Sequence, residues 1–186
     1  MGKVVLGVTI SLDGFAEDAN GSVAALYPDL ETLRNTEVLK ESMRDTGAVV
    51  MAWKEFAMAE DPDWFAGNYE YQVPIFVVTD KAPEKHPKET GELTFTFVKG
   101  GFEAAVRQAR EAAAEKIVTI IGSSATTQYC LRAGLADELY IDVIPVFVNN
   151  GFRPFDDIGT RPIQVKRIKV VELPGGRIHM RFRIGK

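Results

Sequence analysis

Cysteine is almost absent from this chain of 186 residues, which has only Cys130. One thiol can form neither an internal disulfide nor a zinc site built from several cysteines. Histidine is also scarce: His86 lies in a polar stretch and His179 on the polar side of an alternating pattern. Neither has neighbours at the spacing of metal ligands. We therefore expect both imidazoles to be solvated, and we expect no metal site.

Long apolar runs and an excess of basic charge are missing as well. No stretch of about 18 apolar residues occurs, so we expect no membrane span. The 26 acidic residues outnumber the 22 basic ones, and this net charge of −4 argues against sequence-independent binding of nucleic acid. The first residues enter a strand pattern without a signal-peptide cleavage site, so we expect a cytoplasmic protein. With 46% hydrophobic residues and no linker-like segment, one domain is expected over residues 1–186.

The apolar periodicity predicts strands and helices that alternate along most of the chain. Strands are expected at 3–10, 48–51, 74–79, 93–98, 116–121, 138–148, 164–173 and 177–184. Helices are expected at 29–46, 53–58, 101–115 and 124–133. The alternation predicts an α/β protein with a mainly parallel sheet covered on both faces, and the last two strands predict an antiparallel hairpin.

Three of the expected helices carry clear packing signals. The helix over 101–115 has one stripe, made of Phe102, Ala105, Val106, Ala109 and Ala113. The helix over 29–46 has one apolar stripe, made of Leu30, Leu33, Val38, Leu39 and Met43. The helix over 124–133 is expected to stop at Gly134, with Leu135 folding back on Cys130 in a Schellman ending. These patterns predict which side of each helix points to the core.

The common fingerprints of catalysis and phosphate binding do not occur. There is no G-x-G-x-x-G and no G-x-x-x-x-G-K-[ST] motif, which removes the two commonest phosphate-binding loops. There is no G-x-S-x-G motif, which removes the nucleophile elbow of serine hydrolases. Three less specific features remain.

The first feature is Ser11-Leu12-Asp13-Gly14-Phe15, at the carboxyl end of the first expected strand. Ligands bind at the carboxyl ends of strands in open α/β sheets, so a hydroxyl and a carboxylate there would suit a polar ring. An Asx-type turn with Gly14 at positive φ accounts for the same residues. From spacing alone, the turn is the better explanation.

The second feature is Ile121-Gly122-Ser123-Ser124, between a buried strand and a helix. The first turn of that helix offers unpaired N–H groups and the positive end of a dipole, which suit a phosphate or carboxylate. Gly122 would let a ligand approach the backbone, and Ser124 or Thr126 would add a hydroxyl. A serine N-cap on an ordinary helix explains the same residues, and spacing does not separate the two interpretations.

The third feature is the stretch 49–56, where a strand passes directly into a helix start. This helix start would point at the same edge of the sheet as the second feature. Within it, Trp53 is more often a packing residue than a stacking platform. Lys54 is more often a solvated charge than a phosphate contact.

Taken in order, these features resemble the dihydrofolate-reductase-like family. The matching segments are 11–15, 46–51, 71–79, 122, 131–139 and 145–146. The most specific is Ala-Gly-Leu-Ala-Asp-Glu-Leu at 133–139. The resemblance covers about residues 2–184, and it is closest to the reductase domain of riboflavin-biosynthesis deaminase–reductases and its stand-alone bacterial relatives.

The resemblance implies a three-layer α/β/α domain whose mixed, mainly parallel sheet ends in an antiparallel C-terminal hairpin. It implies a reductase that passes hydride from NADPH to a small-molecule substrate, a heterocycle or a carbonyl compound. Ser11 would orient the substrate ring, and Asp13 would place or donate the proton, directly or through a water. The implied cofactor contacts are Ala52, Trp53, Lys54, Thr79, Gly122, Ser123, Ser124, Ala125 and Thr126. A homodimer is also implied, with the apolar run 144–148 as a candidate contact.

The chain departs from the family pattern where the cofactor phosphates would bind. Trp53 replaces an arginine, Glu55 a threonine, Asp80 a basic or polar residue, and Ser123 a glycine. A charge-assisted hydrogen bond is worth about 1.5–3 kcal/mol, so losing one and adding carboxylates predicts NADPH binding weaker by about 10²-fold or more. We therefore expect weak NADPH binding, a shift to NADH or to another ligand such as a flavin, or no cofactor.

The same departures support an alternative of a different class. A protein that keeps this fold but has lost redox chemistry would bind a small ligand or a partner. The substrate is also left open, because pterins, pyrimidines and other carbonyl compounds all fit so loosely specified a site.

Overall fold

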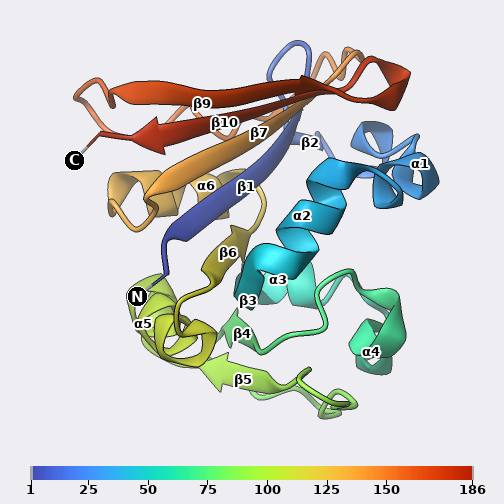
Figure 1. The fold of residues 1–186 in the computed structure, drawn as a ribbon, viewed down its shortest axis with the longest axis vertical. Helices are drawn as coiled ribbons and strands as arrows, with labels where there is room; N and C mark the ends of the chain where they lie inside the picture. Colours follow the sequence, from blue (N-terminus) through green and yellow to red (C-terminus); the bar gives the residue numbers. More distant parts are fainter. Residues whose placement is uncertain (1, 186) are drawn as a thin grey trace. The chain divides into compact units, whose positions relative to one another are not determined.

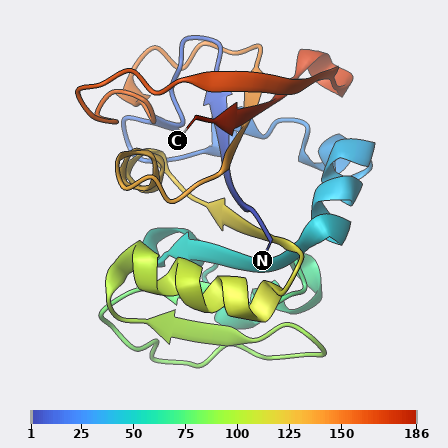
Figure 2. The same cartoon turned by 60° about the vertical axis from the view of Figure 1, so that its left-hand side comes forward.

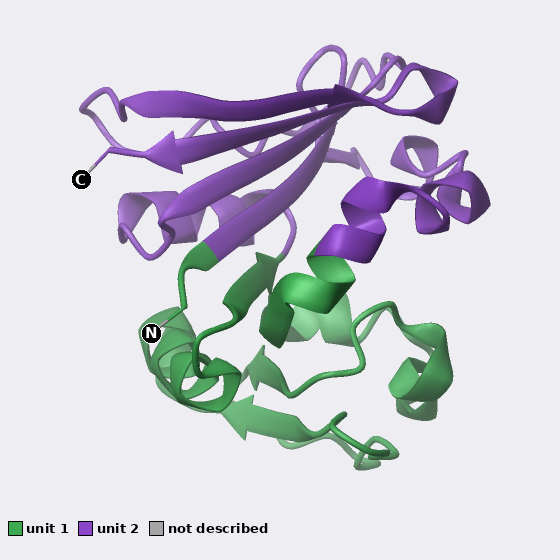
Figure 3. Cartoon of the chain, viewed as in Figure 1, with its two compact units in different colours: residues 1–4, 42–121 green, residues 5–41, 122–186 purple. Residues whose placement is uncertain are grey.

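The structure is a computed structural model and describes residues 2–185. The chain forms two compact units, which Figure 3 colours separately. Unit 1 comprises residues 2–4 and 42–121, and unit 2 comprises residues 5–41 and 122–185. Within residues 2–185, no helix combines the length and the apolar character needed to cross a membrane.

Unit 1 is built on four strands that follow the order β5-β4-β3-β6. They are β3 (Thr46–Ala52), β4 (Ile75–Val78), β5 (Phe95–Val98) and β6 (Ile117–Ile121). β3 pairs in parallel with β4 and β6, and β4 pairs in parallel with β5. The strands are rich in apolar residues because both faces of a parallel sheet are covered. Their carboxyl ends therefore share one edge of the sheet in this unit.

Helices cover both faces of the unit 1 strands. α5 (Gly101–Ala113) lies along the strands in Figure 2. Its buried stripe is the one expected: Phe102, Ala105, Val106, Ala109 and Ala113. A second apolar cluster includes Phe56 of α3 (Trp53–Phe56) and Phe65 of α4 (Phe65–Asn68), packed on β3, β4 and β5. A 3-10 helix, η2 (Pro62–Trp64), precedes α4.

Unit 2 contains the mixed part of the fold, with the strand order β1-β7-β10-β9. These strands are β1 (Val4–Ser11), β7 (Glu138–Ile144), β9 (Val165–Glu172) and β10 (Ile178–Ile184). β1 and β7 are parallel, whereas β10 is antiparallel to both β7 and β9. The expected C-terminal hairpin turns through η3 (Pro174–Gly176), and a two-stranded ribbon joins β2 (Glu17–Asp18) to β8 (Gly151–Phe152).

Helices also lie on both sides of the unit 2 strands. Figures 1 and 2 show α6 (Ser124–Arg132) and the start of α2 (Glu37–Asp45) on opposite sides of β1, with η1 (Ala24–Leu26) and α1 (Leu30–Arg34) before α2. α6 ends as predicted: Leu135 N donates to Cys130 O at 3.0 Å, and Gly134 has a φ of +63°. The three-layer α/β/α architecture with its mainly parallel strands and antiparallel hairpin is confirmed.

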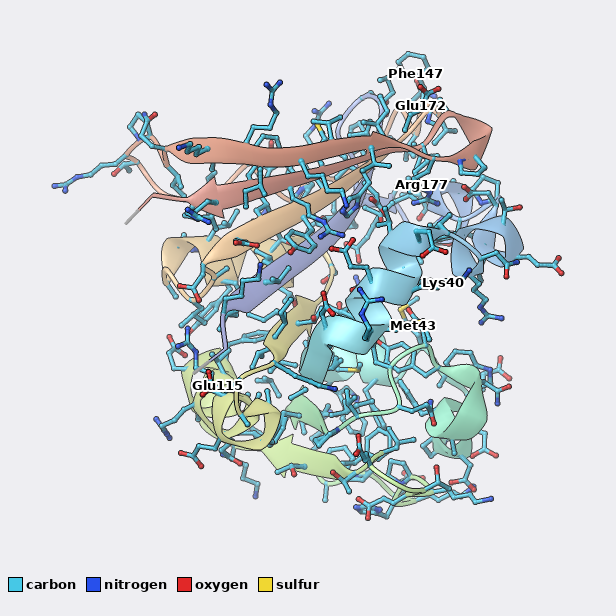
Figure 4. All side chains as sticks on the ribbon, in the orientation of Figure 1. Lys40, Met43, Glu115, Phe147, Glu172 and Arg177 are labelled. Carbon is cyan, nitrogen blue, oxygen red and sulfur yellow. The ribbon has the colours of Figure 1, made fainter. Side chains whose placement is uncertain are left out.

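The helix expected over 29–46 is divided in the structure. Thr36 caps the second part, because its Oγ1 accepts a hydrogen bond from Leu39 N at 3.3 Å. Leu30 and Met43, which were predicted to be buried, are 46% and 40% exposed, and Figure 4 shows Met43 projecting from α2. The prediction for these two side chains was wrong, because the break changes which residues share one helical face.

The strand expected over 138–148 ends earlier, at Ile144. Pro145 follows directly, and a proline has no N–H group to donate to a neighbouring strand. The remainder of the segment is a loop, in which Phe147 is 63% exposed. This loop leads toward the site described next.

Candidate active site

The carboxyl end of β1 brings Ser11 and Asp13 together. Ser11 is fully buried, and its Oγ donates to Asp13 Oδ1 at 2.6 Å while accepting from Phe15 N at 2.9 Å. The Asp13 carboxylate also accepts from Val148 N at 3.1 Å through Oδ1 and from Asn149 N at 2.8 Å through Oδ2. Asp13 therefore ties the end of β1 to the loop after β7.

These hydrogen bonds control the charge of Asp13. Desolvation raises its pKa, but the hydrogen bonds from Ser11, Asn149 and Val148 outweigh that effect and lower the pKa from 3.8 to about 2. The side chain is accordingly ionised at neutral pH. A carboxylate has about four acceptor positions, so a group that already accepts from three donors retains capacity for an external one.

The turn interpretation of this segment is correct in part. Gly14 has a φ of +89°, and its N–H donates to Ser11 O at 2.9 Å. Asp13, however, is held by Val148 and Asn149, which lie 135 and 136 residues further along the chain. The sequence near Asp13 could not predict these partners, because a main-chain N–H group of any residue type can donate. Asn149 gave one indication of a turn at this place in the loop, since its φ of +68° is tolerated by asparagine better than by most residues.

The loop that holds Asp13 also reaches the start of α6. Ser124 Oγ donates to Phe152 O at 3.0 Å. The guanidinium of Arg153 lies 4.2 Å from the centre of the Phe15 ring. In unit 2, the segment 148–153 thus contacts both the β1 turn and the helix start. It also adds a cation, Arg153, that the sequence interpretation missed.

The residues predicted to cradle a phosphate occupy the first turn of α6. Ser123 is the N-cap residue, and its side chain makes no capping hydrogen bond to the helix. Ser124 and Thr126 are buried, and a Cβ on Gly122 would come within 2.4 Å of the Thr126 side chain. Ala125 is exposed. This helix start therefore offers its backbone N–H groups to an anion more readily than its hydroxyls.

The other predicted helix start, at α3, packs its aromatic residue into the unit. The Trp53 ring lies 5.3 Å from the ring of Phe56 and 6.4 Å from that of Phe97, centre to centre. These contacts agree with the packing interpretation of Trp53. Ala52 precedes the helix in extended backbone, and Lys54 is exposed. The position of the family arginine is thus filled by an apolar group in contact with the core.

The residues after β4 make a local turn. Thr79 Oγ1 accepts from Lys81 N at 3.0 Å, and Asp80 is exposed. The Thr79 hydroxyl consequently stabilises its own loop. The cofactor contacts expected in unit 1 and those expected in unit 2 both stay predictions.

A buried chain of charges on β7 and β10 was not foreseen. His179 was expected to be solvated, but it is 5% exposed, so that prediction was wrong. Its Nδ1 lies 2.7 Å from Asp142 Oδ1, and Arg181 Nε donates to its Nε2 at 2.9 Å, which places the imidazole proton on Nδ1. Arg181 also makes a bidentate pair with Glu41 of α2, at 2.9 and 3.1 Å. The helix covers this side of the strands and excludes water from it.

Arg177 continues this chain at the start of β10. It is 1% exposed, and it donates to the Asp29 carboxylate at 2.7 and 3.2 Å and to Leu26 O at 3.1 Å. Figure 4 shows Arg177 on the side of β10 that faces α1. Among residues 2–185, no group of three or more His, Cys, Asp or Glu side chains has a geometry suited to a metal ion. The network is built of ion pairs and hydrogen bonds, and its groups satisfy one another.

Comparison with protein families finds a match to the RibD C-terminal domain over residues 2–178. A search of curated proteins finds no match. Among solved structures, a Shewanella protein named for riboflavin biosynthesis is similar, with a TM-score of 0.75 and 20% identity over 99% of both chains.

Two further solved structures with a similar fold are of proteins named as reductases. The Thermotoga maritima diaminohydroxyphosphoribosylaminopyrimidine deaminase/5-amino-6-(5-phosphoribosylamino)uracil reductase has a TM-score of 0.68 and 15% identity. That comparison covers 99% of this chain but 57% of the bifunctional one. Dihydrofolate reductase from Enterococcus faecalis, in complex with NADP(H) and RAB-propyl, has a TM-score of 0.61 and 15% identity over 100% and 98% of the chains. At these identities the likeness is one of fold.

Proposed function

The chain belongs to the RibD C-terminal domain family, and on that premise we propose that residues 1–186 form a single reductase domain. The enzyme transfers hydride from a nicotinamide cofactor to a small heterocyclic or carbonyl substrate. One observation carries the proposal: an ionised Asp13, anchored by the buried Ser11, at the carboxyl end of β1. Ligands of open α/β sheets bind at this edge.

Asp13 serves the proposed reaction as a hydrogen-bond acceptor. A carboxyl with a pKa of about 2 is a poor direct acid at neutral pH, so Asp13 accepts from a ring N–H or positions the water that delivers the proton. Ser11 orients this carboxylate. Arg153, stacked on Phe15, favours a substrate that also carries an anionic group. The phosphoribosylaminouracil named for the Thermotoga maritima protein has both an N–H-bearing ring and a phosphate.

The cofactor fits one helix start better than the other. The first amides of α6, from Gly122 to Thr126, suit a phosphate because the Ser123 side chain does not cap them. At α3, the packed Trp53 stands where the family has an arginine, and the exposed Lys54 follows it. A lysine ammonium cannot bind a phosphate through two parallel hydrogen bonds as an arginine guanidinium does. When bound, the nicotinamide supplies the hydride. NADPH binds weakly in this proposal, and NADH binds comparably.

Turnover of purified protein tests the proposal. Oxidation of NADPH and NADH is followed with the phosphoribosylaminouracil or with dihydrofolate as substrate. We expect Asp13→Asn to lower kcat by about 10²-fold, because the acceptor of the ring N–H or water is weakened. Ser11→Ala should lower kcat less, and Asp45→Asn, a surface control on α2, should leave it unchanged. An Asp13→Asn enzyme as fast as wild type removes Asp13 from the mechanism.

A second function is supported by the same helix starts. Trp53 is packed, and Ser124 Oγ is engaged with Phe152 O, as expected if the fold binds a small ligand without redox chemistry. In that case neither nicotinamide binds at about millimolar concentration and neither is oxidised. A bound flavin is a third possibility, separate from the function without redox chemistry, and a yellow purified protein would reveal it.

A further inference from the structure

Three polar side chains of α6 bind one stretch of chain beside the helix. Ser124, Gln128 and Arg132 are spaced by four residues, so they lie on one stripe of an α-helix. Each donates a hydrogen bond to a main-chain carbonyl oxygen. The acceptors, in the same order and at 3.0, 2.9 and 2.9 Å, are the carbonyls of Phe152, Arg153 and Asp157. The segment 151–157 therefore follows α6 in the direction of the chain.

Hydrogen bonds, more than apolar burial, hold the segment 151–157 in place. Within it, Pro154 is the one buried residue. Arg132 adds an ion pair with the Asp157 carboxylate. On the side of the β1 turn, β8 pairs with β2, and Ala16 N donates to Phe152 O at 2.9 Å. Phe152 O thus accepts a hydrogen bond from each side.

This segment directly follows the two amides that hold Asp13. Val148 N and Asn149 N donate to the Asp13 carboxylate, and the residues 150–151 alone separate Asn149 from Phe152. Consecutive Cα atoms are about 3.8 Å apart, so the Cα atoms of Asn149 and Phe152 can be no more than about 11 Å apart. Fixing the segment on α6 consequently restricts where the two amides can lie.

We propose that Gln128 and Arg132 are positioning residues for Asp13. By fixing the segment 151–157 on α6, they keep the two main-chain amides that precede it against the Asp13 carboxylate. The part that Asp13 takes in a reaction rests on the proposed function. The position and the ionisation of Asp13 are properties of the folded chain, and they can be measured without a substrate.

Loosening the segment should change the ionisation of Asp13. Desolvation raises the pKa of Asp13, and hydrogen bonds from Ser11, Asn149 and Val148 outweigh this effect and lower the pKa to about 2. When the two amides are in place less often, the pKa should rise to about 3, toward the ordinary value of 3.8. Arg153 is the charged side chain packed on the same turn, and the variants below retain it.

Two variants test the proposal and leave Asp13 and its donors unchanged. Gln128→Met keeps the length of the side chain and alters no charge, whereas Arg132→Ala removes a donor and an ion pair. In each variant, amide hydrogen exchange of Val148 and Asn149 at neutral pH should be about 5–10-fold faster, because one lost hydrogen bond changes a local opening equilibrium by about that factor. Amides within β7 should exchange as in wild type.

Two controls separate this effect from a change of charge or of folding. Arg44→Gln removes an arginine of unit 1 from an exposed pair with Asp45, so it changes the net charge as Arg132→Ala does and should leave both amides unaffected. Arg132→Lys keeps a donor and the charge, so exchange should stay within about 2-fold of wild type. Circular dichroism of each variant checks that the chain remains folded.

The carboxyl ¹³C NMR signal of Asp13 gives a second measurement. A pKa of about 2 leaves about one-tenth of the Asp13 carboxyl protonated at about pH 3, whereas a pKa of about 3 leaves about half protonated. Gln128→Met and Arg132→Ala should show the second behaviour, with circular dichroism recorded at the same pH. A variant that only lost stability would keep the wild-type midpoint while folded.

Exchange rates and an Asp13 titration that match wild type in both variants would overturn the proposal, as would an equal effect of Arg44→Gln. Both measurements are free of substrate, so a wild type that oxidises neither nicotinamide would contradict the proposed function and leave this test standing. In a protein that turns over, Gln128→Met and Arg132→Ala should lower kcat by about 3–10-fold, less than Asp13→Asn, and change the KM of the cofactor by less than about 2-fold.

Discussion

Asp13 is the residue whose chemistry depends most on distant parts of the chain. Its neighbours Ser11 and Gly14 form a turn that spacing alone suggests, but two of its three donors come from Val148 and Asn149. These donors stabilise the charged form of the carboxyl and lower its pKa to about 2. The same contacts hold the Asp13 side chain in place and keep it ionised, so that it acts as a hydrogen-bond acceptor at neutral pH.

The lowered pKa predicts how Asp13 affects stability. The folded pKa of about 2 lies below the ordinary value of 3.8, so the stabilisation is present above about pH 4 and is lost as the pH falls to about 2. Asp13→Asn should therefore reduce the free energy of unfolding most at neutral pH. Urea unfolding at a series of pH values measures the difference from wild type, with Asp45→Asn as control. A difference that stays constant down to about pH 2 would contradict this.

Trp53 is a residue whose role sequence reasoning anticipated. An indole at the start of a helix, beside a buried strand, most often packs, and Trp53 contacts the rings of Phe56 and Phe97.

His179 shows the limit of such reasoning. Its place on the polar side of an alternating strand indicated solvent, yet Asp142 and Arg181 bury it in a hydrogen-bonded chain. Whether the polar face of a strand is buried depends on which helix covers that face, and the residues of that helix lie far away in the sequence.

At the scale of elements, α2 and β10 are joined by the Glu41–Arg181 pair. The hydrogen bond from Arg181 lowers the pKa of Glu41 from 4.5 to about 2, although desolvation opposes this. Glu41→Gln should lower the free energy of unfolding by about 2 kcal/mol, because Arg181 is 8% exposed and would keep its charge after losing the carboxylate that it binds in a bidentate pair.

The matched control lies on the same helix. Glu37→Gln removes an exposed pair with Lys40, in which the Glu37 side chain is 88% exposed, so it should cost about 0.5 kcal/mol or less. Chemical denaturation of the two variants beside wild type gives both values. Equal losses would show that the Glu41–Arg181 pair contributes no more than a surface contact.

Periodicity predicted the element types well and their limits less well. α5 buries the stripe that its pattern indicated, and α6 stops at Gly134 with the predicted hydrogen bond from Leu135 to Cys130. Periodicity did not predict the interruption of the expected helix over 29–46 just before α2. The capping hydroxyl of Thr36 is a single residue, whereas the apolar repeat on either side of it continues as in one long helix. Helix caps of this kind act over a few atoms, whereas periodicity averages over many residues.

At the scale of the whole molecule, ligand binding should appear as added stability. A ligand at ten times its dissociation constant stabilises a protein by about 1.4 kcal/mol, and at a thousand times by about 4.1 kcal/mol. For a chain of this size, each kcal/mol raises the Tm by about 2–4 °C. We expect about 1 mM NADPH to raise the Tm by roughly 3–6 °C, and NADH to do the same within about 2 °C.

Thermal unfolding monitored by tryptophan fluorescence measures these shifts. Adenosine at the same concentration is the control, because it lacks the phosphates that the α6 amides would bind. A shift of about 16 °C or more with NADPH alone would mean submicromolar binding, which would contradict the proposed weakening of the phosphate site. No shift with either nicotinamide favours the function without redox chemistry.

The sequence by itself determined the fold class, the hairpin, most of the buried stripes and the family, because these follow from periodicity and from short motifs that adjacent residues carry. Only the tertiary structure decided that Asp13 is clamped by Val148 and Asn149, that the α6 hydroxyls turn inward, and that the polar side of β10 is the buried one. The physical reason is the range of the interactions. Hydrogen bonds and burial depend on atoms brought together from distant segments, and no local pattern of residue types encodes which segments those are.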